Sequence, residues 1–591
     1  MRPPGVENPS MTSCASDFGI PTKRRLSSTI GFMKGSEAAV ETLRQLGVEV
    51  IFGLCGDTTL PLYEALHDLD HGMRHILTRD ERSASFMADA YARLGGKAGV
   101  CEAPSGGGVT YILPGVAEAN GSSAPLVCLT SDIDRKDRGR GTLTELDQTA
   151  LFRPVTRWTH MPEVASEIPR TLRRAFRTAT SGAMGAVHVG LSFDVQVGDA
   201  GSEPIVRDER ASRYPRNRVG PDLDDVRRAA LVLAQARRPV ILAGAGVVRS
   251  EAWDPVRELA HRLGAPVATS ISGKGSIAET DPYSLGVVGS NGGLPYRHEI
   301  LRQADVLLVI GCSLGSVTTE KWTLPERGKT RILQLDVDPD RLGHNYGIEF
   351  GIVADARLGV EALLEECSRS MSGAAGKIDP EEIEKRRRAH LESVSEFHSN
   401  ETPIRPERFL TELLPRLPDG TVMCVDPGTG CPYLSAYYRL PRAGRWFVSP
   451  RAHGALGYAL PAVCGAYFAR PDASRVLGIM GDGSFGISCG ELETLARLSL
   501  PVTLVVLNNS GYGWIKAGQK VRGRKYYSVD FSDSDHAAIA RAFGLAARRV
   551  ERPEELASAI EESLSSKGPF LLDVVVQPLH EAKAPVSKWI A

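Results

Sequence analysis

The chain has 591 residues, which is too long for one hydrophobic core, so we expect roughly three or four domains. Its 70 Lys plus Arg residues nearly balance its 71 Asp plus Glu residues, and this balance excludes a global field that would recruit nucleic acid or an anionic membrane. Since 42% of the residues are hydrophobic, the chain can bury enough apolar surface to fold. We therefore expect a globular protein whose partner is a small molecule.

The ten cysteines are scattered and contain no C-x-x-C pair, which is typical of a reduced, intracellular protein and predicts a cytoplasmic location. No apolar run approaches the roughly 20 residues that a transmembrane helix needs. Residues 1–32 are polar and contain Pro and Ser without an apolar signal core. We predict a disordered extension there and a folded part that starts at Met33.

Helix and strand patterns alternate along the first folded block, residues 33–206. The expected elements are a helix over 36–46 and strands over 48–52, 76–78 and 125–130. Such alternation predicts a parallel sheet with helices on both faces. The charged, Pro-containing residues 207–218 are interpreted as a linker.

A second alternating block, residues 219–366, has expected strands over 240–243, 306–310 and 332–335. Residues 367–405 combine a Ser/Gly stretch with a charged helix, a composition typical of a solvated connector. The third block covers residues 406–591. The fold class predicted for the chain is therefore α/β, with three doubly wound parallel-sheet domains.

The most specific pattern lies in the third block, where two buried strands are expected over 476–480 and 502–507. Gly481, Asp482 and Gly483 follow the first strand, and Asn509 follows the second after one residue. The residues between the strands predict a crossover helix over 490–498, whose N-terminus could face an anion. Strands joined in this way are parallel and adjacent, so Asp482 and Asn509 should emerge together at the carboxyl edge, where open α/β sheets bind ligands.

Asp482, the amide of Asn509 and the backbone carbonyl of Gly511 are hard oxygen donors. They suit Mg²⁺ that completes its shell with water and a phosphorylated cofactor. Gly-Asp-Gly alone is also typical of simple turns, and the interpretation depends on the joint placement of the two motifs.

A second pattern surrounds Glu81, which follows the expected strand over 76–78 and lies in the first turn of a helix that ends at a Gly-Gly pair, 95–96. Taken alone, an acid in this position complements the helix dipole.

Together the two patterns resemble the thiamine-diphosphate enzymes, in their acetolactate synthase-like branch, along most of the chain. The matching segments are the metal motif from Gly481 to Asn509, the helix of residues 79–93 (with Asp80 for His and Ala90 for Gly), the loop of residues 105–110, the stretch of residues 454–461 and, in the middle block, residues 336–339. The resemblance implies pyrimidine-binding, central and diphosphate-binding domains, in that order.

The resemblance also implies roles for single residues. Glu81 of one subunit would hydrogen-bond the aminopyrimidine of the cofactor, and the raised pKa of a carboxyl in a dry pocket would let it share a proton there. Leu456 would stand in the place of the apolar wedge that bends the cofactor, unless it is an ordinary core leucine. Gly454, two residues before it, would be a further cofactor-binding residue. Gly481, Gly483, Asp482, Asn509 and Gly511 would hold Mg²⁺ and the diphosphate. Active sites between subunits make a homodimer the minimum unit, and a homotetramer is equally open.

The implied reaction is decarboxylation of a 2-oxo acid such as pyruvate, followed by carboligation to a second carbonyl compound. Thr144 replaces a glutamine that lines the substrate side in acetolactate synthases, and Trp514 and His453 are further candidates for that side. A non-ligating 2-oxo acid decarboxylase and a catalytically silent cofactor-binding protein are the alternatives. The chain lacks the His-His pair of pyruvate-type decarboxylases, and Ser313 replaces an arginine of the flavin-binding synthases, which disfavours FAD.

Overall fold

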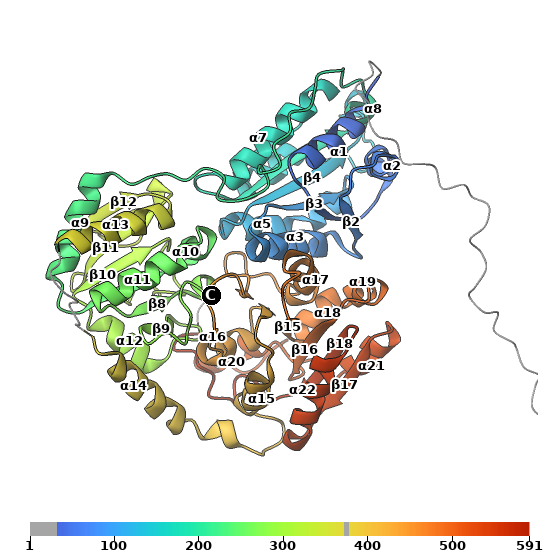
Figure 1. The fold of residues 1–591 in the computed structure, drawn as a ribbon. Helices are drawn as coiled ribbons and strands as arrows, with labels where there is room; N and C mark the ends of the chain where they lie inside the picture. The colour runs from blue at the N-terminus through green and yellow to red at the C-terminus, as the bar shows by residue number, and fades with distance from the viewer. Residues whose placement is uncertain (1–31, 371–377, 590–591) are drawn as a thin grey trace, which may run out of the picture.

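The computed structural model describes residues 32–370 and 378–589. Three six-stranded sheets follow one another along the chain, and their strand pairs are parallel. Figure 1 shows them as three lobes in blue, green to yellow, and orange to red. The predicted α/β class with three parallel sheets is confirmed. The predicted extension lies outside the described residues except for residue 32.

The first sheet has the order β2-β1-β3-β4-β6-β5. Its strands are β1 (Val50–Gly53), β2 (Arg74–Leu77), β3 (Gly99–Ala103), β4 (Leu126–Asp132), β5 (Trp158–His160) and β6 (Ala186–Ser192). Apolar side chains of α1 (Gly35–Gln45), α2 (Leu60–Asp68) and α7 (Ile168–Thr180) cover one face. Those of α3 (Glu81–Gly95) and α5 (Leu113–Gly121) cover the other.

The central sheet has the order β12-β11-β10-β7-β8-β9. Its strands are β7 (Pro239–Ala243), β8 (Val267–Thr269), β9 (Ser284–Val287), β10 (Val306–Ile310), β11 (Arg331–Asp336) and β12 (Phe350–Val353). Helices α9 (Leu223–Gln235), α11 (Trp253–Leu263) and α13 (Ala356–Ser370) pack on one face, and α12 (Pro295–Arg302) and α14 (Pro380–Ser393) on the other.

The third sheet has the order β14-β13-β15-β16-β18-β17. Its strands are β13 (Thr421–Val425), β14 (Phe447–Val448), β15 (Arg475–Gly481), β16 (Val502–Asn508), β17 (Ala546–Val550) and β18 (Phe570–Val575). The helices around it include α15 (Pro406–Leu413), α16 (Gly430–Tyr437), α17 (Ala459–Ala469), α18 (Asp482–Ser488), α19 (Leu492–Arg497), α20 (Gly513–Val521), α21 (His536–Ala542) and α22 (Leu556–Ser565).

Most predicted elements lie within two residues of the observed ones, and β10 spans the predicted 306–310. The predicted crossover helix over 490–498 is observed as α19, whose ends lie within two residues of the predicted ones, but a further helix before it was not predicted. A helix, α18, already begins at Asp482, and α19 follows after a 3-10 turn, Cys489–Glu491. The two glycines after Asp482 masked this first helix, because glycine disfavours helix interiors.

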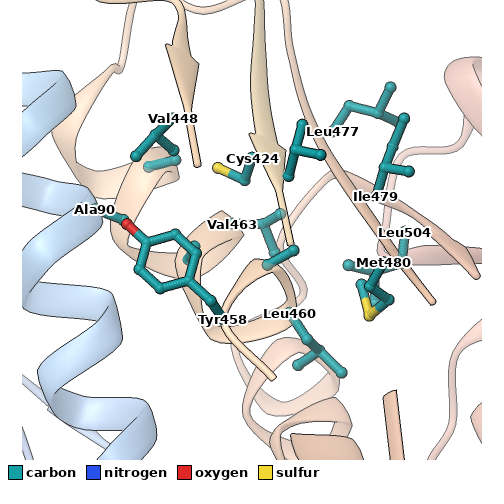
Figure 2. Close-up of a cluster of buried hydrophobic side chains, with 14 of the residues drawn as sticks. Ala90, Cys424, Val448, Tyr458, Leu460, Val463, Leu477, Ile479, Met480 and Leu504 are labelled. Carbon is teal, nitrogen blue, oxygen red and sulfur yellow. The ribbon is translucent and has the colours of Figure 1, made fainter. Parts of the chain in front are cut away.

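The N-terminal and C-terminal sheets share one core, because α3 and α17 pack directly against each other (Figure 1). The close approach requires Gly465, where an added Cβ would lie 2.1 Å from the carbonyl oxygen of Met87. Figure 2 shows Tyr458, just before α17, among apolar side chains of the third sheet, with its hydroxyl directed toward α3. The helix that starts at Glu81 is therefore fixed to the C-terminal part of the chain.

The connecting segments are partly packed. Residues 207–218 contain no helix or strand, yet Tyr214 is buried and donates to the carbonyl of Ala92 at 2.6 Å. The predicted charged connector helix is observed as α14. Among the described residues no helix is both long and apolar enough to cross a bilayer. The domain boundaries at 33, 206, 219, 366 and 406 stay predictions.

Candidate active site

Three polar side chains lie at the carboxyl ends of three neighbouring strands in the third sheet. Thr429 follows β13, Asp482 follows β15 and Asn509 follows β16. We call these three residues the carboxyl-edge cluster. Because β15 and β16 pair in parallel over 476–481 and 502–507, Asp482 and Asn509 emerge side by side, as the sequence predicted.

Asp482 is the hub of this cluster. It is buried, and its Oδ2 accepts the backbone N–H of Asn509 at 2.9 Å and that of Gly511 at 3.4 Å. Its Oδ1 accepts the N–H of Gly483 at 2.8 Å. Burial raises the pKa of Asp482, and the backbone donors oppose that shift. The carboxylate therefore fixes the turn after β16 and keeps a lone-pair position for a further ligand.

Within the described residues, the side-chain nitrogen of Asn509 has a hydrogen-bond partner and its side-chain oxygen has none. Its Nδ2 lies 3.4 Å from Oγ1 of Thr429, while no hydrogen bond within the described residues engages its Oδ1. The carbonyl of Gly511 accepts the N–H of Gly513 at 2.9 Å. Gly481 and Gly483 have no side chain that would cover the backbone beside the cluster. A Cβ on Gly483 would lie 2.7 Å from the ring of Tyr512.

The chemistry of this donor set fits Mg²⁺ and a diphosphate. One carboxylate, one amide oxygen and one carbonyl are hard ligands that leave several positions for water and phosphate oxygens. The described residues contain no group of three or more His, Cys, Asp or Glu side chains suited to a metal. A cation here would thus depend on oxygens that a phosphorylated ligand supplies.

Glu81 begins α3 in the N-terminal sheet and is 7% exposed. Burial raises the pKa of its carboxyl, and Asp80 and Glu102 add to the shift. A Cβ on Gly108 would lie 2.9 Å from Oε1 of Glu81, so the glycine of the 105–110 loop gives the carboxyl its space. Asp80 caps α3 by accepting the N–H of Arg82 at 2.7 Å, a local role that a histidine would not perform in the same way.

Glu81 does not reach the carboxyl-edge cluster of its own chain. In the described residues no hydrogen bond or ion pair joins them. The start of α3 instead meets Glu491, whose Oε1 accepts the N–H of Arg79 at 2.8 Å. Burial raises the pKa of Glu491 to about 7.

Comparison with known families assigns all three parts of the chain. The N-terminal TPP binding domain of thiamine pyrophosphate enzymes matches residues 33–151, the central domain matches residues 226–363 and the C-terminal TPP binding domain matches residues 428–574. The chain belongs to the thiamine pyrophosphate enzymes. Glu81 lies in the first of these regions, and the carboxyl-edge cluster lies in the third.

Several known proteins are similar to this thiamine pyrophosphate enzyme over most of its length. A Methanococcus aeolicus protein named "Probable acetolactate synthase large subunit" is 33% identical, and one of the same name from Methanocaldococcus jannaschii is 34% identical. Each comparison covers 92% of this chain and 92% of the relative. An acetolactate synthase of Mycobacterium bovis is 29% identical over 92% of this chain and 88% of its own.

Leu456 lies in a turn of this thiamine pyrophosphate enzyme between two glycines with left-handed backbone, Gly454 at φ 72° and Gly457 at φ 83°. Its side chain is half-buried. A Cβ on Gly457 would lie 2.9 Å from the side chain of Ile487. Position 457 therefore requires glycine for two reasons, its left-handed backbone and the lack of space for a Cβ.

The three predicted substrate-side residues contact different parts of the chain. Thr144 has φ 70°, and its Oγ1 is 2.7 Å from Oγ of Ser105, beside the loop that makes room for Glu81. Trp514, on α20, packs edge-on against Trp589 with ring centroids 4.9 Å apart. His453 is exposed, and its backbone N–H donates to Glu118 at 2.7 Å.

Sequence reasoning missed Thr429 and Asp426 at the end of β13. Asp426 is buried, burial raises its pKa to about 7, and its Oδ1 accepts the N–H of Tyr458 at 2.8 Å. The signal was available: residues 421–425 form a buried strand that ends in Asp-Pro-Gly, the same strand-then-polar pattern that identified Asp482.

Proposed function

We propose that this chain is a Mg²⁺-dependent thiamine diphosphate carboligase that decarboxylates a 2-oxo acid such as pyruvate and joins the remaining carbons to a second carbonyl compound. The observation that carries the proposal is the pairing of Asp482 with Asn509 across two parallel strands, within a chain whose relatives are named acetolactate synthase. When bound, the cofactor would supply the electron sink for loss of CO₂.

Different residues of the chain would bind the metal, hold the proton and contact the cofactor rings. Asp482, the amide oxygen of Asn509 and the carbonyl of Gly511 would hold Mg²⁺ on the diphosphate. Glu81, with its pKa raised by burial, would hold a proton at the aminopyrimidine nitrogen that faces it. Leu456 would hold the two cofactor rings in a bent arrangement by contact alone.

The proposal requires two copies of the chain. No hydrogen bond or ion pair in the described residues joins Glu81 to the carboxyl-edge cluster of its own chain, and the proposal places the Glu81 of a second copy at each site, as the family resemblance implies. Two large apolar side chains close to the loop of residues 105–110 support this requirement. Tyr111 is 58% exposed and Leu143 is 85% exposed in the single chain, and a second copy of the chain would cover them. Light scattering across protein concentrations tests whether the unit is a dimer or a tetramer.

FAD is not part of the proposal. A cavity of about 430 Å³ lies at the carboxyl edge of the central sheet, lined among others by Gly244, Cys312, Ser313 and Asp336. Ser313 stands where the resemblance expects an arginine, which disfavours a flavin, but Arg249 and Arg341 also line the cavity and could pair with a diphosphate. An absorbance band near 450 nm in the freshly purified protein, released on denaturation, would show that a flavin is bound.

Product analysis tests the reaction. The purified protein is incubated with Mg²⁺, thiamine diphosphate and pyruvate, with and without a second aldehyde or 2-oxo acid, and products are identified by NMR. We expect a hydroxy ketone or acetohydroxy acid that contains carbons of both substrates. Free acetaldehyde as the sole product would favour a simple decarboxylase, and neither product with any 2-oxo acid would favour a catalytically silent protein.

A further inference from the structure

Residues 451–458, which we call the Leu456 loop, are held by a buried carboxylate of the N-terminal sheet. Glu118 lies on α5 and is fully buried. Its oxygens accept four consecutive backbone N–H groups, those of Arg451 at 3.0 Å, Ala452 at 3.1 Å, His453 at 2.7 Å and Gly454 at 3.4 Å. A single side chain thus fixes the backbone directly ahead of Leu456.

The charge of Glu118 is supported from its own side. Arg93 of α3 donates to its Oε1 at 2.8 Å, and the hydroxyl of Ser122 donates to the same atom at 2.7 Å. Burial alone would raise the pKa of Glu118, but Arg93 and these donors reverse the shift and the pKa is lowered. The carboxylate is therefore ionised, and an ionised acceptor binds backbone N–H groups more strongly than a neutral one.

The other end of the Leu456 loop is held as well. The backbone N–H of Tyr458 donates to Asp426 at 2.8 Å, and its hydroxyl donates to Asp89 of α3 at 2.7 Å. Asp89 in turn pairs with Arg93 at 2.9 Å. Because Arg93 also binds Glu118, one buried network of α3 and α5 holds both ends of an eight-residue loop that has two left-handed glycines inside it.

We propose that Glu118 is a positioning residue that sets the place of Leu456 against the cofactor, with Asp426 and Asp89 holding the far side of the same loop. The inference rests on the proposed function, in which Leu456 bends the cofactor. The N–H groups of Arg451 to Gly454 bind the carboxylate of Glu118 and not the backbone of a helix or strand. Removal of that carboxylate therefore frees the loop and lets Leu456 move.

The test measures hydrogen–deuterium exchange at C2 of thiamine diphosphate bound to the full-length protein with Mg²⁺, together with cofactor affinity. The variants are Leu456→Ala, Glu118→Gln and the two combined. We expect Glu118→Gln to slow exchange about tenfold, Leu456→Ala to slow it about a hundredfold, and the double variant to match Leu456→Ala, since Glu118 acts only through Leu456. Cofactor affinity should change less than about threefold, because the diphosphate ligands are untouched.

The matched control is Asp355→Asn. Asp355 is also a buried carboxylate that accepts backbone N–H groups, from Arg357 at 3.1 Å, and pairs with an arginine, Arg218 at 2.7 Å, but in the central domain. It should lower thermal stability and leave C2 exchange at the wild-type rate. If Glu118→Gln does not fold, Tyr458→Phe replaces it, because it removes only the hydroxyl that binds Asp89, and it should slow exchange severalfold.

The outcomes distinguish a failure of the positioning role of Glu118 from a failure of the proposed function. C2 exchange at the wild-type rate in Glu118→Gln would overturn the positioning role of Glu118. A double variant whose slowing is the product of the two single effects would overturn it as well. Neither result would contradict the role proposed for Leu456. Unchanged exchange in Leu456→Ala would overturn the role of Leu456 and with it the role of Glu118, whereas no accelerated exchange in the wild-type holoprotein would overturn the proposed function itself.

Discussion

The carboxylate of Asp482 accepts the backbone N–H of Asn509 at 2.9 Å and so joins the carboxyl ends of β15 and β16. With the bonds that it also accepts from Gly483 and Gly511, Asp482 uses three of its roughly four lone-pair positions. Within the described residues no hydrogen bond engages the amide oxygen of Asn509. This relationship turns two short polar motifs, 27 residues apart, into one oxygen-rich edge.

Asp482→Asn should weaken Mg²⁺ binding roughly 100-fold, because a neutral amide replaces the only carboxylate of the proposed ligand set. Wild-type protein at a ligand concentration 100 times its Kd should gain about 2.7 kcal/mol of stability, and the variant should gain almost none at that concentration. Thermal unfolding with and without EDTA measures the difference. Asp472→Asn, at a surface ion pair of the same part of the chain, should behave as wild type.

Glu81→Gln should slow C2 exchange about 100-fold or more, because the amide cannot hold the transferable proton. Affinity for the diphosphate should be retained. Glu64→Gln on the exposed side of α2 serves as the control. Equal exchange rates in Glu81→Gln and the control would exclude Glu81 from the proton transfer.

Gly108→Ala should act on Glu81 without changing it. The new Cβ would lie 2.7 Å from Cδ of Pro104 and 2.9 Å from Oε1 of Glu81, so the carboxyl must shift. We expect about tenfold slower C2 exchange. Gly107→Ala is the matched control, because its Cβ would have only an ordinary contact of 4.0 Å with the ring of Tyr111.

Glu407 predicts a pH dependence of stability that is unrelated to catalysis. Burial raises its pKa from 4.5 to about 7, and its Oε2 has no hydrogen-bond partner among the residues that the structure describes. Between these two values the folded chain holds a proton that the unfolded chain has released, so this group lowers the free energy of unfolding as the pH rises from 4.5 to 7.

Glu407→Gln should therefore be more stable than wild type at pH 8, by roughly 3 kcal/mol, and the gain should vanish near pH 4.5. Urea unfolding of both proteins at four or five pH values measures the difference. Glu392→Gln on exposed α14 should leave the wild-type slope unchanged. A gain that is the same at every pH would contradict the argument.

Much of the fold could be predicted from short stretches of sequence. The strands over 306–310 and 502–507 are runs of buried apolar residues, and such runs show their structure locally. The polar residues after them, Asp482 and Asn509, were located by the rule that parallel strands share a carboxyl edge. The start of α18 could not be predicted, because tertiary contacts override the low helix propensity of Gly483 and Gly486.

The sequence by itself determined the three parallel sheets, the polar oxygen-bearing side chains at the ends of β15 and β16, and the acid at the start of α3, because each depends on neighbours within one βαβ unit or one helical turn. Only the tertiary structure decided what holds Leu456. Glu118 is 335 residues from His453, and Asp89 is 369 residues from Tyr458. No periodicity or spacing encodes such contacts, since they arise only when α3, α5 and α17 pack into one core and each buried charge must find its partner there.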